Sequence, residues 1–309
     1  MLINLQPISA MENGFDAPKI GRTVPLIQNW GSGILMCTGF LYTERIVLTA
    51  GHCMFNGAER SRQTDVSVGF PHETYYLDSK RIKVVKSFVA PNWGWADNEN
   101  FNPKGEFGIY VLGVPISVPG TAVIATKEKV RELISNRTLI TNVAYGLQKP
   151  GDSPDGLPSR SAKYAEFPMV PLEEVMVEAN KALTSMGKKY YNMQIHVLQL
   201  PNGPSTCGGD SGSPLYVLEG DTYIYLAPLS NGIGGIPNCT GKPWSDSKMY
   251  VGGVAAYDYL DLIREAEDYV KANPYVAPVI KKSIKCVKGK KVISVRNEFP
   301  KCPKGYKQK

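Results

Sequence analysis

Residues 207–214 read Cys207-Gly208-Gly209-Asp210-Ser211-Gly212-Ser213-Pro214, and this octet carries most of the information about fold and chemistry. A serine flanked by small residues, four positions after a cysteine, is typical of a nucleophile in a sharp turn. The glycines let backbone approach backbone, so that N–H groups can point at one spot. An ordinary Gly-Ser turn has the same composition, so the interpretation depends on a partner elsewhere in the chain.

That partner has to be a base, because a serine hydroxyl is a poor nucleophile at neutral pH. Histidine suits the task, since its pKa lies near the working pH. Of the three histidines, His72 follows a proline in a polar stretch and is expected in a loop, and His196 lies in an alternating run and is expected in a strand. His52 is the candidate base because an apolar run leads straight into it.

The two stretches Thr49-Ala50-Gly51-His52-Cys53 and Gly209-Asp210-Ser211-Gly212, in this order, resemble the trypsin/chymotrypsin-like serine peptidases, in an exported form of bacterial type. The resemblance covers about residues 11–272. It implies an all-β fold of two six-stranded antiparallel barrels with a C-terminal helix. It also implies an active site between the barrels, with Ser211 as nucleophile, His52 as base, and the N–H groups of Gly209 and Ser211 as the oxyanion hole.

The third member of the triad is a carboxylate that accepts the other ring N–H of the histidine. In the family an Asp opens an apolar strand, and Pro follows nine residues later. Here Glu106, nine residues before Pro115, stands at that position, so the triad residue would be a glutamate with one methylene more. Asp97, in the preceding polar loop, is the alternative. A third interpretation makes both residues loop carboxylates of a crippled site.

The resemblance also supplies a disulfide pairing. Cys37 lies 16 residues before Cys53, as in the family's histidine loop, and we pair Cys207 with Cys239 and Cys286 with Cys302. Six paired cysteines indicate an oxidising compartment, whereas six buried free thiols are the alternative. No C-x-x-C or H-x₃-H spacing occurs, so we expect no metal, and the chemistry needs no cofactor.

Residues 1–10 are too short and too weakly apolar for a full signal peptide, although they end in the small residues Ser9-Ala10. We interpret them as the remnant of a leader or pro-segment, with Met11 as the first residue of the mature chain. In the family, the freed amine pairs with the Asp before the nucleophile, here Asp210. Removal of residues 1–10 should then raise activity.

The substrate pocket follows from the same register. Its floor falls at Ser205, a neutral residue that argues against a preference for Lys or Arg at P1. Its walls fall at Ser230, Gly232 and Lys248. An ammonium directed into the pocket would favour an acidic P1 side chain; alternatively, Lys248 extends to water.

Turn residues separate many short β-type runs, and two stretches, 171–189 and 257–273, have helical periodicity. No run of 18 apolar residues is present. We expect a leader remnant at 1–10, a peptidase domain at 11–273 and a tail at 274–309. Between Lys281 and Lys309 lie 11 Lys or Arg and one Glu, so the tail carries +10 of a chain whose net charge is +7.

The tail, with two cysteines bracketing an apolar run, is interpreted as a disulfide-closed hairpin. It either attaches the protein to an anionic cell wall or membrane surface or only solubilises it. Aromatic residues are few there, so we expect no nucleic-acid partner. The chain as a whole is interpreted as a secreted, monomeric serine endopeptidase that cleaves protein or peptide substrates through an acyl-enzyme. The alternative is an inactive homologue acting as a binding or adhesion module.

Overall fold

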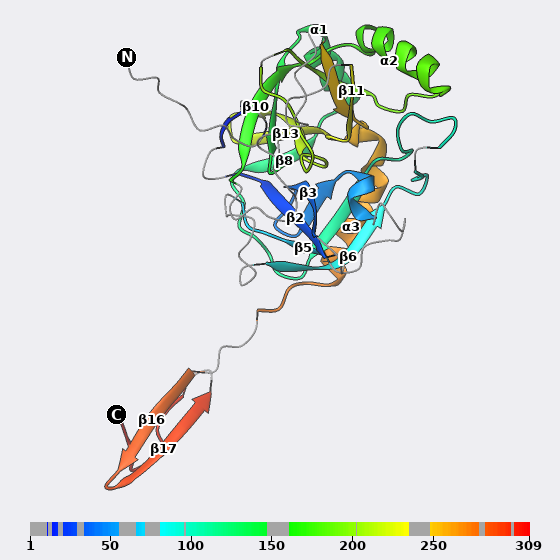
Figure 1. Cartoon of the computed structure of the whole chain (residues 1–309). Helices are drawn as coiled ribbons and strands as arrows, with labels where there is room; N and C mark the ends of the chain where they lie inside the picture. Colours follow the sequence, from blue (N-terminus) through cyan, green and yellow to red (C-terminus); the bar gives the residue numbers. More distant parts are fainter. Residues whose placement is uncertain are drawn as a thin grey trace, which may run out of the picture. The chain divides into compact units, whose positions relative to one another are not determined.

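Two units make up the chain, Met1–Asn273 and Pro274–Lys309. The computed structural model in Figure 1 describes residues 11, 14–17, 21–29, 34–55, 66–71, 81–95, 97–146, 161–201, 203–234, 248–277, 282–297 and 300–309. Within these residues the fold is predominantly β, which confirms the all-β class expected from the sequence.

The first half of the larger unit is a closed barrel in which every neighbouring pair is antiparallel. Its strands, in the order β2-β3-β4-β7-β6-β5, are β2 (Thr23–Asn29), β3 (Ile34–Leu41), β4 (Ile46–Thr49), β7 (Gly108–Leu112), β6 (Ile82–Val89) and β5 (Val66–Val68). Side chains of strand β7 point alternately to its two faces, and both faces are buried. Tyr110 and Leu112 fill the barrel, whereas Ile109 and Val111 face the second half.

The second half contains two sheets around one core. The larger has the order β1-β10-β9-β12-β13-β8, from β1 (Phe15–Asp16), β10 (Lys163–Pro168), β9 (Leu139–Ala144), β12 (Pro214–Glu219), β13 (Thr222–Pro228) and β8 (Thr121–Ile124). The smaller has the order β11-β15-β14, from β11 (Ile195–Gln199), β15 (Met249–Gly253) and β14 (Asn231–Gly234). The β13–β8 pair is parallel, which departs from the all-antiparallel expectation. Side chains of both sheets share one hydrophobic core, and an isolated bridge from Met169 to Val197 links the sheets.

An aromatic and aliphatic cluster joins the two halves. Phe40 of β3 stacks on Tyr225 of β13, with ring centroids 4.9 Å apart, and both rings are fully buried. Helix α3 (Leu260–Ala272), which follows the short 3₁₀ turn η4 (Ala256–Tyr259), contributes Ile263 and Ala266 to this cluster. The C-terminal helix expected at 257–273 is therefore present and covers the seam between the halves.

Two further helices lie in the second half. Helix α2 (Leu172–Met186) occupies the stretch expected at 171–189 and ends at Gly187. Helix α1 (Lys127–Ser135) was not predicted. Its signals are a Thr126 cap, whose hydroxyl accepts a hydrogen bond from the Lys129 N–H at 3.1 Å, and two buried aliphatic residues one turn apart.

The smaller unit is a three-stranded antiparallel sheet in the order β17-β16-β18. The strands are β16 (Lys282–Lys288), β17 (Lys291–Asn297) and β18 (Lys307–Gln308). The disulfide Cys286–Cys302 joins β16 to the segment between β17 and β18. Nowhere in the described part of the chain is a helix both long enough and apolar enough to cross a membrane.

Replacement of Phe40 by alanine tests the seam. We expect Phe40→Ala to lower the free energy of unfolding by about 3–5 kcal/mol, because it removes a buried ring and leaves a cavity. Phe15→Ala is the matched control, since Phe15 is 60% exposed, and it should cost about 0.5 kcal/mol. Urea unfolding followed by circular dichroism measures both; equal effects would contradict this assignment of the core.

Candidate active site

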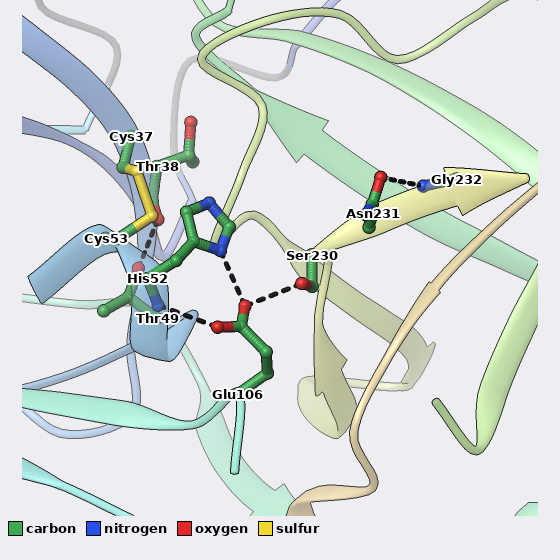
Figure 2. A network of polar contacts seen from close by, with 9 residues as sticks. All are labelled: Cys37, Thr38, Thr49, His52, Cys53, Glu106, Ser230, Asn231 and Gly232. Atoms are coloured by element: carbon green, nitrogen blue, oxygen red, sulfur yellow. Dashed lines mark hydrogen bonds and ion pairs between the residues drawn. A yellow bond between two sulfur atoms is a disulfide. The ribbon is translucent and has the colours of Figure 1, made fainter. Parts of the chain in front are cut away.

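A buried carboxylate joins three elements of the larger unit (Figure 2). Glu106, two residues before β7, is fully buried, and its Oε2 lies 2.6 Å from Nδ1 of His52. The backbone N–H of His52 donates to the other carboxylate oxygen, Oε1, at 3.0 Å. The hydroxyl of Ser230 donates to Oε2 at 2.6 Å. His52 lies on the 3₁₀ turn η1 (Gly51–Met54), and its side chain remains 24% exposed.

These contacts shift both pKa values. Burial by itself lowers the pKa of His52, but the adjacent Glu106 carboxylate outweighs it and raises that pKa above the ordinary value. Burial would raise the pKa of Glu106, but His52 and the hydrogen bonds from Ser230 and the His52 backbone lower it. The pair therefore keeps the carboxylate ionised and favours a proton on His52. The contact at Nδ1 leaves Nε2 as the ring nitrogen that can exchange a proton with another group.

Asp97, the alternative third member, has its partners within its own loop. Its carboxylate accepts hydrogen bonds from the Glu99 N–H, the Asn100 N–H and the Asn100 side-chain amide at 2.8–3.0 Å. The bonds from Asn100 come first among the causes that lower the pKa of Asp97 to about 2. Asp97 thus closes a turn, while Glu106 contacts the histidine.

Ser230 has a position that the sequence interpretation did not assign to it. It was placed in the pocket wall on the pattern Ser230-Asn231-Gly232, but its buried hydroxyl points to Glu106 (Figure 2). The two residues are 124 positions apart, so no local pattern indicates the contact.

The segment that holds Ser211 is attached to both halves. The Thr38 N–H donates to the Ser211 carbonyl at 2.7 Å, and the Gly212 N–H donates to the Leu229 carbonyl at 2.6 Å. A side chain at Gly212, where φ is +80°, would collide with the Thr49 hydroxyl and the Thr38 carbonyl. Glycine therefore lets the nucleophile segment lie directly against the strand that leads into η1.

Neither the Gly209 N–H nor the Ser211 N–H donates a hydrogen bond within the described part of the chain. In this turn Gly209 has a φ of +91°. These are the two N–H groups that the resemblance assigns to the oxyanion hole.

Two buried polar groups stabilise the turn around Ser211. The Asp210 carboxylate accepts hydrogen bonds from the N–H groups of Gly146 and Cys207, both at 2.7 Å. The Ser213 hydroxyl accepts a hydrogen bond from the Asn142 side-chain amide at 2.8 Å. The Ser213 hydroxyl thus has a buried partner on β9, which sequence reasoning had not identified.

A disulfide between Cys37 and Cys53 ties β3 to η1, with 6.1 Å between the Cα atoms. Sulfur atoms of this pair lie near the ring nitrogens of His52, but their bond to each other leaves no thiolate for a metal ion. Cys207 is also disulfide-bonded; its expected partner, Cys239, lies outside the described residues.

The residues expected to form the substrate pocket are close to β11, β14 and β15. Ser205 is fully buried, and hydrogen bonds between Thr206 and the Gln199 side chain, 3.1 and 3.2 Å long, hold its segment on β11. Gly232 lies in β14. Lys248, just before β15, is exposed, which fits the alternative that its ammonium lies in water. Residues 235–247, between the two wall strands, lie outside the described part.

Met11 is fully buried in the core of the second half, where its neighbours include Ile140 and Ala144. Residues 1–10, the expected leader remnant, lie outside the described residues, as does His72. His196 lies in β11 as expected, buried and stacked on Tyr191, and burial lowers its pKa to about 4.

Comparison with known proteins agrees with this geometry. The family model described as Trypsin matches residues 16–241, which include the segments that carry His52, Glu106 and Ser211. The chain belongs to the trypsin family. A trypsin-like protease of Streptomyces glaucescens is 27% identical over 219 residues, which cover 69% of this chain and 71% of the relative. The larger unit is therefore a trypsin-family peptidase domain, and peptidases of this family act on proteins or peptides.

The Glu106 carboxylate provides the first functional test. We expect Glu106→Gln to lower kcat by about 10⁴-fold, because an amide can present its N–H to Nδ1 and impose the wrong tautomer. Glu106→Asp keeps the charge but shortens the side chain by one methylene, and a displacement of this size should cost about 10²-fold.

Asp97→Asn is the matched control and should keep kcat within about threefold, since Asp97 contacts its own turn. Turnover of a peptide substrate by the three purified variants measures the effects. A loss of activity in Asp97→Asn with activity retained in Glu106→Gln would reverse the assignment.

Proposed function

We propose that the protein is an exported serine endopeptidase in which Ser211 attacks the scissile carbonyl. His52, as the neutral imidazole, takes the hydroxyl proton through Nε2 as the Oγ–C bond forms. It then gives the proton to the leaving amine as the C–N bond breaks, which leaves an acyl-enzyme. Water, deprotonated by the same imidazole, hydrolyses that ester and restores Ser211.

The observation that carries this proposal is that the Glu106 carboxylate accepts three hydrogen bonds, two of them from His52. Its carboxylate lies 2.6 Å from Nδ1 and is buried, so it can stabilise the imidazolium that forms in each step. The second bond, to the His52 backbone, sets the position of η1 relative to the carboxylate. The N–H groups of Gly209 and Ser211, which donate no hydrogen bond among the described residues, would hold the oxyanion of each tetrahedral intermediate.

Export is supported by the disulfides in both units, which form and persist in oxidising compartments. The floor residue Ser205 carries no charge, so we propose that the P1 side chain is not basic. The competing function is that of an inactive homologue whose surfaces bind a partner. The buried Glu106 carboxylate at Nδ1 of His52 favours the enzyme, because it makes the imidazole a stronger base, and a binding module has no need for this.

A fluorophosphonate probe separates these two functions, since it reacts only with an activated serine. We expect covalent labelling of the chain that begins at Met11, and its loss in Ser211→Ala and in His52→Ala. Ser185→Ala, at an exposed position of α2, is the control and should label like the parent. Absence of labelling in the chain that begins at Met11, with its fold intact by circular dichroism, would establish the inactive homologue.

Activation is proposed to require removal of residues 1–10. Met11 is already buried, and its freed amine would be available to the Asp210 carboxylate, which orders the turn around Ser211. We expect the chain that begins at Met11 to be at least tenfold more active than the full chain, and Asp210→Asn to abolish the difference.

The measurement is peptide turnover by both chains, with N-terminal sequencing of the secreted, active protein. Equal activity of the two chains, or active protein that still begins at Met1, would contradict this route of activation.

A further inference from the structure

One face of the smaller unit carries four basic side chains, while the strand residues Lys288 and Lys291 belong to the opposite face. Side chains alternate along a strand, and residues paired across an antiparallel ladder share a face. The pairings in β16, β17 and β18 therefore place Ser283, Lys285 and Val287 on the same face as Arg296, Ser294, Val292 and Lys307. Lys309, whose N–H donates to the Lys285 carbonyl, continues this arrangement. We call the set Lys285, Arg296, Lys307 and Lys309 the basic face.

The disulfide determines which face stays open. Cys286 points to the opposite side, together with Ile284, Ile293 and Val295, and its bond to Cys302 brings residues 300–306 over that side. Cys286 is buried and the three aliphatic residues are partly buried, whereas all four cations of the basic face are exposed. The opposite side is therefore the small core of the unit, and the basic face is its outer surface.

The charge of the basic face is not neutralised within the unit. Among the residues that the structure describes, none of its four cations has an ion-pair partner. Residues 281–309 contain a single acidic residue, Glu298, against 11 basic ones. Like charges held side by side on a sheet repel one another, so a partner that supplies several negative charges relieves this repulsion.

The geometry favours a polymer over a small anion. Exposed ion pairs are individually weak, so useful affinity requires several contacts on one chain. Neighbouring strands lie about 4.8 Å apart and alternate residues about 7 Å apart, so one extended chain can contact all four cations. A membrane surface fits less well, since interfacial docking uses large apolar or aromatic anchors and this face offers only Val287 and Val292. Among the described residues, the basic face has no aromatic side chain on which nucleic-acid bases could stack.

We infer that the basic face binds a linear polymer that carries phosphate groups along its length, of the kind found on anionic cell surfaces. Three of the four cations are lysines, which bind phosphate oxygens as compact point charges with three rotatable donors. Through this contact the peptidase would be retained at a surface.

The test compares two full-length variants of equal net charge. In the face variant Lys285, Arg296, Lys307 and Lys309 become Gln. In the control variant Lys290, Lys291, Lys301 and Lys304, which are exposed in the turn, on the opposite side or in the segment that covers it, become Gln. Far-UV circular dichroism and a thiol assay establish that both variants keep the sheet and its disulfide.

Binding is measured by biolayer interferometry on immobilised linear inorganic polyphosphate at 50 mM salt. We expect the face variant to bind at least tenfold more weakly than the parent, and the control variant to stay within about threefold. The slope of log Kd against log salt should fall by about 3 in the face variant only. Turnover of a soluble peptide should be equal in all three proteins, so the result is independent of the peptidase assignment.

Four results would overturn the inference. Equal losses in the two variants would show that only total charge matters. Tighter binding of polyglutamate of matched length would favour carboxylates. Tighter binding of oligo-dT would favour nucleic acid. Binding to phosphatidylglycerol vesicles without binding to polyphosphate would favour a membrane surface.

Discussion

The buried carboxylate of Glu106 is the interaction on which the rest of the active site depends. It accepts hydrogen bonds from the ring and the backbone of His52, which lies in η1. It also accepts one from Ser230, which lies directly before β14. A buried charge is tolerated only when it is paired and hydrogen-bonded, and removal of one partner costs about 3–5 kcal/mol. The carboxylate therefore holds η1, the start of β7 and the segment before β14 in one arrangement.

Packing on the other side of η1 supports the same arrangement. Gly51 lies so close to Trp93 that a Cβ atom there would collide with the indole ring. Phe55, just after η1, stacks on Trp93 with ring centroids 3.8 Å apart. The histidine turn is thus held by aromatic packing, by the disulfide to β3 and by the carboxylate. Held by these three contacts, the histidine turn places its imidazole at hydrogen-bond distance from Glu106, whose side chain is one methylene longer than that of an aspartate.

Much of this organisation could be predicted from local sequence. The octet around Ser211, the strand register before Pro115 and the helix at the end of the larger unit all depend on patterns within about ten residues. Helix α1 was missed because its apolar residues are few and its Thr126 cap is a single-residue signal. Ser230 contacts Glu106, 124 positions away in the chain, and Ser213 contacts Asn142, 71 positions away. Sequence periodicity cannot predict contacts between such distant residues. The parallel β13–β8 pair likewise forms between segments about 100 positions apart.

The central claim is that the Glu106 carboxylate at Nδ1 of His52 makes this imidazole a stronger base, and that the neutral imidazole activates Ser211. An NMR pH titration of the histidine ring nitrogens in the intact protein tests it most directly, with His52→Gln used to assign the signal. His196, whose pKa burial lowers to about 4, serves as an internal reference. The account predicts a pKa for His52 above the ordinary value of about 6.5 and a decrease in Glu106→Gln. A pKa at or below 6.5 that the substitution leaves unchanged would contradict it.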